Sequence, residues 1–301
     1  MLRDRSSDLV ESVARSLGSG VVADLGPYTE PVVADVVVLA TPTGTHAELA
    51  RELLANDISV VSASDSLHDV GALLELDAEA RERDCSVVVG AGFSPGLSCV
   101  LARHAAGDFT SVDEIHVAMS GTGGPACARQ HHDALGDWAI DWRDGGWVRR
   151  RGGSGRELCW FPDPIGGRDC YRAARPEALL LAPSFAGVAR VTARMGATRR
   201  DRLTSRLPML RRPHPEGGPG GVRVEVRGWR DDQRHVKVLG AMDRPAVAAG
   251  AVAAVAVTTI LDGGVSRPGA AGLAELVETV PFLSELARRG VRAAVFEGLT
   301  S

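Results

Sequence analysis

Lysine is almost absent from this sequence. Lys237 is the sole lysine among 34 basic residues, and all the others are arginines. A mechanism that depends on an active-site lysine therefore has a single candidate. The formal net charge is −4, and because nucleic-acid binding rewards clustered positive charge, we expect no nucleic-acid partner. The run Arg149, Arg150 and Arg151 is more typical of an exposed strand or loop face than of a phosphate site.

Paired cysteines and long apolar stretches are also missing. The five cysteines include no CxxC pair, so neither a disulfide framework nor a zinc knuckle is indicated, and we expect reduced thiols in the cytoplasm. The N-terminal segment is charged from Arg3 onward and lacks the apolar run of a signal peptide. The longest apolar stretch, residues 245–261, is shorter than the ~20 residues of a membrane span. It predicts a buried helix and no membrane association.

The first part of the chain has the pattern of a parallel sheet joined by helices. β-branched runs alternate with helical periodicity, and apolar runs of this kind belong to strands that are covered on both faces. The expected strands are residues 35–40, 58–62 and 86–89, and the expected helices are residues 46–56, 67–83 and 97–106.

After Gly90 the pattern changes. Four of the five tryptophans lie between positions 120 and 165, which indicates a second, less regular domain. Strands are expected at residues 112–119, 187–195, 222–229 and 235–239, the last two as an antiparallel pair, followed by a helix at 245–261, a helix at 273–289 interrupted by Pro281, and a strand at 291–296. We therefore divide the chain into residues 1–92, 93–243 and 244–301.

A glycine-rich phosphate-binding turn is missing near the N-terminus, although the rest of this part is typical of a dinucleotide-binding domain. Asp4 and Arg5 are placed as they would be at the tip of the second strand of such a domain, which would make the chain begin one β-α unit late. The alternative is a charged, frayed terminus. The turn at residues 90–96 follows a strand, but we interpret it as an interdomain turn because no acidic residue ends the next strand.

Several segments together resemble the saccharopine dehydrogenase-like family of NAD(P)-dependent oxidoreductases. They are residues 34–46 (ADVVVLATPTGTH), 60–65 (VVSASD), 89–98 (VGAGFSPGLS), 121–125 (GTGGP) and 137–146 (DWAIDWRDGG). The resemblance implies an α/β fold with a Rossmann-type parallel sheet, here N-terminally truncated, an inserted α+β domain for substrate and dimerisation, and C-terminal helices that return to the first domain. Loss of the central first strand should split the sheet.

The resemblance also implies which residues meet the cofactor and the substrate. Asp4, Arg5 and Ser6 would contact the adenosine ribose or its phosphate, Asp24 and Leu25 the adenine side, and Ala40, Thr41 and Pro42 the underside of the dinucleotide. Phe93, Ser94, Pro95, Gly96, Gly123 and Gly124 would face the substrate. Arg5 and Ser6 favour NADP, whereas Asp4 favours NAD, and the missing turn weakens either expectation.

Histidine is the natural proton carrier near neutral pH, and His131 and His132 follow the glycine loop on an expected helix. We take them as the catalytic candidates. Ser94 stands where many amino-acid-linked relatives carry an acid before Pro-Gly, and a serine hydroxyl is a poor proton carrier. Cys127, His131 and Asp133 are residue types that bind metals, but only the first two share the i, i+4 spacing, so no metal is predicted.

The sequence thus predicts a cytoplasmic NAD(P)-dependent oxidoreductase that acts on a C–N or C–O bond of a small substrate. An amino-acid derivative is the substrate class that the resemblance favours. The tryptophan-rich domain leads us to expect a homodimer. The alternative is a non-catalytic relative, a binding or partner subunit that has lost the cofactor turn.

Overall fold

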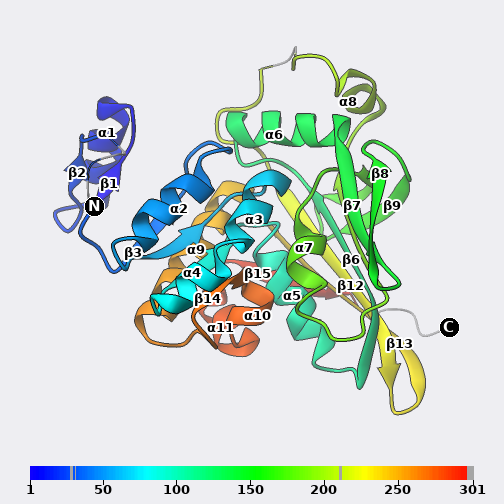
Figure 1. Ribbon diagram of the computed structural model, residues 1–301. Helices are drawn as coiled ribbons and strands as arrows, with labels where there is room; N and C mark the ends of the chain where they lie inside the picture. Colours follow the sequence, from blue (N-terminus) through cyan, green and yellow to red (C-terminus); the bar gives the residue numbers. More distant parts are fainter. Residues whose placement is uncertain (28–29, 31, 210–211, 297–301) are drawn as a thin grey trace. The chain divides into compact units, whose positions relative to one another are not determined.

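The computed structural model describes residues 1–27, 30, 32–209 and 212–296 (Figure 1). Its contacts divide the chain into two compact units, Met1–Ala34 and Asp35–Ser301. In the described part no helix is long and apolar enough to cross a membrane.

The N-terminal unit is a small β-α-β element. Strands β1 (Leu2–Arg3) and β2 (Ala23–Asp24) pair in parallel, and helix α1 (Ser7–Leu17) connects them. Ser6 caps this helix by accepting a hydrogen bond from the backbone N–H of Leu9. The expected strand tip at the N-terminus is therefore present, and a helix follows it.

The larger unit contains a four-stranded parallel sheet in the order β14-β5-β4-β3. Its strands are β3 (Val36–Leu39), β4 (Ser59–Ser62), β5 (Ser86–Val89) and β14 (Gly269–Gly272). Helices α2 (His46–Leu54), α3 (Leu67–Leu74) and α4 (Asp77–Glu82) lie on its near side in Figure 1, and α9 (Pro245–Leu261) packs against β3 and β4. Strands β4 and β5 are fully buried, and their valines belong to the hydrophobic core, while Ser59, Ser62 and Ser86 are buried serines at the strand ends.

The parallel strands thus form two separate sheets, β1-β2 and β14-β5-β4-β3. This arrangement agrees with the split expected of the sheet. The α/β class with a Rossmann-type sheet is confirmed, and strand β14 extends that sheet where the sequence indicated only a break between helices.

A mixed sheet of nine strands forms the second layer of the larger unit. The order is β15-β13-β12-β6-β11-β10-β9, and β7 pairs with β11 and β8. The bounds are β6 (Ser111–Ser120), β7 (Trp138–Arg143), β8 (Gly146–Arg151), β9 (Glu157–Phe161), β10 (Gly166–Arg172), β11 (Arg190–Gly196), β12 (Gly220–Arg230), β13 (Gln233–Asp243) and β15 (Arg292–Phe296). Strands β12 and β13 pair antiparallel, as predicted.

The remaining helices of the larger unit pack against the two sheets and against one another. Helix α5 packs against β12 and β13 and also contacts α10 and α11. The bounds are α5 (Leu97–Ala106), α6 (Pro125–Gly136), α7 (Glu177–Leu181), α8 (Arg199–Thr204), α10 (Leu273–Leu276) and α11 (Thr279–Arg288). One hydrophobic core, which includes Val88, Leu101 and Val224, runs through both layers.

Two predicted helices are each divided in the structure. Residues 67–83 form α3 and α4, separated at Glu75 and Leu76. Residues 273–289 form α10 and α11, and the break falls at Val277 and Glu278 rather than at Pro281. Pro281 lies in the first turn of α11, where a missing N–H costs no helical hydrogen bond.

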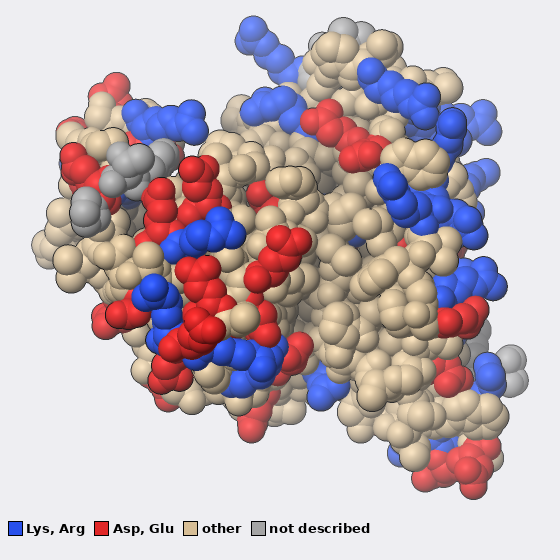
Figure 2. All heavy atoms as spheres, in the orientation of Figure 1, with Lys and Arg blue, Asp and Glu red and all other residues tan. Residues whose placement is uncertain are grey.

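The arginine run at 149–151 lies on strand β8 and is exposed, as its composition predicts. The Arg149 and Arg151 guanidinium groups lie 5.3 and 5.8 Å from the Trp138 ring centroid. Figure 2 shows Lys and Arg side chains gathered along the side of the larger unit where β8, β9 and α8 lie. Arg149 and Arg151 therefore pack on an aromatic ring of the neighbouring strand β7.

Gly96 provides a direct test of the turn between β5 and α5. Its φ is +120°, and a Cβ there would collide with the backbone of Gly92. We expect Gly96→Ala to lower the free energy of unfolding by about 3 kcal/mol, measured by urea unfolding. Gly145→Ala is the matched control, because Gly145 has φ +82° but open space around it; it should cost about 1 kcal/mol. Equal losses would contradict the packing of this turn.

Candidate functional site

A cavity of about 340 Å³ lies in the larger unit beside the carboxyl ends of β4 and β5. Most of its described lining is apolar side chains and glycine. The polar lining residues are Asp65, Ser94, Cys127 and His131. Ligands of open α/β sheets bind outside the carboxyl ends of the strands, so this is the expected position for a site.

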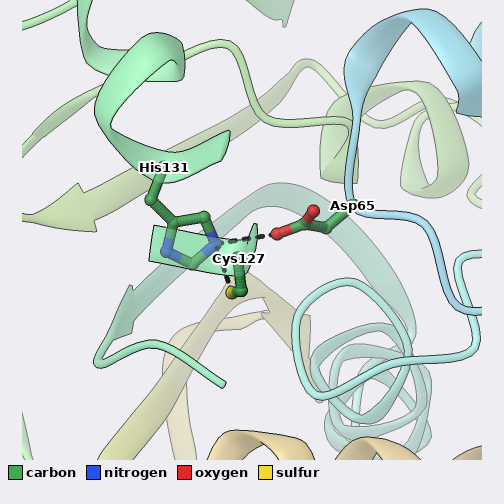
Figure 3. A group of neighbouring side chains, drawn as sticks. All are labelled: Asp65, Cys127 and His131. Carbon is green, nitrogen blue, oxygen red and sulfur yellow. Dashed lines mark hydrogen bonds and ion pairs between the residues drawn. The ribbon is translucent and has the colours of Figure 1, made fainter. Parts of the chain in front are cut away.

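Three elements bring the polar side chains together. Asp65 follows β4 and precedes α3, and Ser94 lies in the turn after β5. Cys127 and His131 are one helical turn apart on α6, which places both on the same face. Figure 3 shows the His131 ring directed toward the Asp65 carboxylate, with the Cys127 sulfur beside it.

A buried ion network supports this end of the cavity. His131 Nε2 lies 2.7 Å from Asp65 Oδ2. Arg175 Nη1 donates to the same oxygen at 2.7 Å, and Arg175 Nη2 donates to Glu177 Oε1 at 3.1 Å and to the carbonyl oxygen of Ser94. The Ser94 hydroxyl donates to Glu177 Oε1 at 2.7 Å. The network therefore begins and ends at residues that line the cavity.

The charges in this network fix its protonation. Burial opposes ionisation of Asp65, but the charge of Arg175 and the contact with His131 outweigh it and hold the pKa of that carboxyl well below its usual range. Burial likewise opposes the charged form of His131, yet the hydrogen bond with Asp65 and the contact with Cys127 raise the pKa of His131 to about 9. At neutral pH Asp65 is an anion and His131 holds a proton.

Asp65, Cys127 and His131 also form a set of possible metal ligands, since their donor atoms all lie within 4.8 Å of one another. The third ligand atom comes from Asp65, not from Asp133, which is exposed. However, Arg175 Nη1 lies 2.7 Å from Asp65 Oδ2 and 3.0 Å from His131 Nε2. A guanidinium so close to two of the three donors repels a divalent cation, so the set fits an ion network better than a metal centre.

The structure gathers most of the predicted substrate residues around this cavity. Phe93, Ser94, Gly123, Gly124 and His131 line it. The remaining candidates, Pro95, Gly96 and His132, are not among the described lining residues. His132 Nε2 contacts the carbonyl oxygen of Leu207 at 2.9 Å, which is a packing role.

The residues predicted to meet the cofactor are divided between the two units. Asp4, Arg5, Ser6, Asp24 and Leu25 belong to the N-terminal unit. There the Asp4 carboxylate accepts a hydrogen bond from the Ser6 backbone N–H at 3.0 Å, and Arg3 Nε donates to Asp24 at 2.8 Å. In the larger unit, Ala40, Thr41 and Pro42 follow β3, and the Thr41 carbonyl oxygen contacts His46 Nε2 at 2.9 Å.

Sequence reasoning assigned no role to Asp65, Arg175 or Glu177. Asp65 lies in one of the segments that resemble the family, so its position at the end of a predicted strand was an available signal. Arg175 and Glu177 offered none, because Arg175 is 110 residues from Asp65 in the chain.

Comparison with solved structures supports the fold assignment. Apo histidine-tagged saccharopine dehydrogenase (L-Glu forming) from Saccharomyces cerevisiae matches with a TM-score of 0.68 at 14% identity, over 98% of this chain and 93% of that chain. The chain therefore has a saccharopine dehydrogenase-like fold, which confirms the fold that the resemblance implied. No family model and no curated protein sequence matches.

Two further matches are weaker. GenD2 from gentamicin A biosynthesis, in complex with NAD, gives a TM-score of 0.43 at 17% identity over 98% of this chain and 88% of that chain. The WlbA dehydrogenase from Bordetella pertussis, in complex with NADH and UDP-GlcNAcA, gives 0.38 at 13% identity over 98% and 89%. These scores are too low to establish a common fold.

The protonation of His131 can be measured directly. We expect its ring to titrate near pH 9 by NMR, and Cys127→Ala to lower that value because it removes a contact that favours the charged form. The folded-state pKa of His131 lies above the ordinary value of about 6.5. The proton on His131 therefore stabilises the folded state fully below about pH 6.5, and this stabilisation is lost as pH rises through about 9. Asp133→Asn is the control. A His131 ring that titrates at or below about 6.5 would contradict the network.

Proposed function

We propose that this protein is an NAD(P)-dependent oxidoreductase of the saccharopine dehydrogenase-like type, acting on a C–N or C–O bond of a small substrate in the cavity. The observation that carries the proposal is His131, a protonated group held by Asp65 at the polar end of an otherwise apolar cavity. The position of the cavity beside the carboxyl ends of parallel strands supports a nucleotide-linked reaction.

Features of the larger unit support placing the nicotinamide end of the dinucleotide there. Glycines at positions 92, 123 and 124 line the cavity, and glycine lets a ring approach the backbone closely. We assign the dinucleotide path to Ala40, Thr41 and Pro42, and the adenosine to Asp4, Arg5, Ser6, Asp24 and Leu25, with NADP favoured over NAD. A bound nicotinamide supplies or accepts a hydride there.

The chain's own residues then perform three tasks. His131 holds the proton for the substrate heteroatom, and Asp65 keeps the ring oriented and charged. Arg175 fixes Asp65 and the Ser94 backbone in place. The apolar walls, which include Phe93 and Met119, limit water around the reacting bond.

We also propose that the protein acts in the cytoplasm as a homodimer that uses its tryptophan-bearing domain. Exposed indole rings at Trp138, Trp147 and Trp160 support this assembly, because such rings are enriched at protein interfaces.

A substitution at position 131 tests the proposed role. We expect His131→Asn to lower kcat for substrate-dependent NADPH oxidation by a factor of about 100 or more, with NADPH binding retained. His132→Asn is a matched control, since the neighbouring ring is buried but does not line the cavity. Equal effects of the two substitutions would contradict the role of His131. A protein that binds neither NADPH nor NADH would instead favour a non-catalytic binding or partner subunit.

A further inference from the structure

One oxygen of the Asp65 carboxylate has no hydrogen-bond partner among the described residues. The contacts of Asp65 with His131 and Arg175 both use Oδ2, and the described residues give Oδ1 no hydrogen bond. The side chain is 20% exposed and lines the cavity. Because the pKa of this carboxyl is held well below its usual range, Oδ1 presents a negatively charged acceptor to whatever occupies the cavity.

Ser94 also presents an acceptor rather than a donor. Its hydroxyl hydrogen is directed to Glu177 Oε1 at 2.7 Å. The lone pairs of Ser94 Oγ are then what the side chain can offer to a ligand in the cavity. Both Asp65 and Ser94 therefore suit a ligand that donates hydrogen bonds.

The described lining residues offer no unpaired cation to a ligand carboxylate. Neither arginine nor lysine is among the described residues that line the cavity. Arg175 is 1% exposed, and both its terminal nitrogens are already bonded to Asp65, Glu177 and the Ser94 carbonyl. The charge of His131 is already balanced by Asp65, although its proton remains the one that the reaction transfers. A carboxylate in the cavity would therefore lose its hydration without gaining a free cation, which is costly.

We propose that the substrate is a small amine and its imine, without a carboxylate, whose nitrogen binds Asp65 Oδ1 and whose apolar group packs on the cavity wall. This inference rests on the proposed oxidoreductase function and narrows it to C–N chemistry. The apolar group has partners in Phe93, Met119, Pro245 and Ala249. A decarboxylated amino acid satisfies both requirements.

The reaction balances with the groups already named. Reduction adds a hydride to the imine carbon and the His131 proton to the nitrogen, and the two π electrons of the C=N bond become the new N–H bond. The product is an amine, one reduced nicotinamide is oxidised, and His131 regains its proton from solvent. In the reverse direction neutral His131 takes the proton from the amine.

Three probes of nearly the same shape test this inference on the native protein. Isoamylamine carries the amine, isoamyl alcohol replaces the nitrogen with oxygen, and leucine adds a carboxylate. We expect isoamylamine to bind at least about tenfold more tightly than either of the others, because its ammonium group forms a charged hydrogen bond with Asp65. Isoamyl alcohol lacks that charge, and leucine adds a carboxylate that finds no free cation. Saturation-transfer NMR and calorimetry, without added cofactor so that no turnover occurs, measure the affinities.

Two variants locate the binding. Asp65→Asn should abolish the preference for isoamylamine over the alcohol, whereas Asp133→Asn, on the exposed side of α6, should leave it unchanged. The comparison on the native protein stands by itself if Asp65→Asn does not fold.

Leucine binding as tightly as isoamylamine, equal binding of the amine and the alcohol, or no binding of the three would each overturn the inference. The proposed function is tested separately, by NADPH oxidation with the 2-oxo acid of leucine plus ammonia and with the corresponding aldehyde plus ammonia. If only the mixture with the 2-oxo acid is turned over, the oxidoreductase function stands and the proposal of an amine substrate without a carboxylate is rejected. Isoamylamine binding without turnover of either mixture would sustain the binding site and reject the oxidoreductase.

Discussion

The candidate site depends on one buried guanidinium. Arg175 is 1% exposed and bonds Asp65 after β4, the Ser94 backbone after β5, and Glu177 at the start of α7. Taking these charges out of water costs several kcal/mol per ion, and pairing offsets that cost in full only when every polar atom has a partner. Among the described residues, Arg175 Nε and Glu177 Oε2 still lack partners. A network with that cost is a poor device for stability alone, and its place behind the cavity wall favours a role in the site.

Local pattern was enough to predict much of the fold. The alternation of apolar runs and helical periodicity before Gly90 predicted β3, β4, β5 and the helices between them, because that signal resides in consecutive residues. Strand β14 was missed since Gly269–Gly272 contains no β-branched residue, and α7 was missed because a five-residue helix shows no full period. The split of the parallel strands followed from strand order, which a family resemblance supplies and composition does not.

The site could be predicted only in part, for a related reason. His131 and His132 were candidates because they follow the glycine loop. Neighbouring residues of a helix point in different directions, and only the structure shows that His131 lines the cavity. The partners that raise its pKa come from distant segments, with Asp65 66 residues away. Ser94, which departs from the acid expected before Pro-Gly, lies against Glu177, so a carboxylate is present from another part of the chain.

The central claim is that Arg175 and Asp65 act as a pair that builds the polar end of the cavity. A double-mutant cycle of Asp65→Asn and Arg175→Met on the free energy of unfolding measures the coupling energy of this pair. Arg175→Met also removes the contact with Glu177, but it does so with and without Asp65, so that loss cancels in the cycle. The account predicts a coupling energy of about 1–3 kcal/mol, whereas additivity within about 0.5 kcal/mol would contradict it.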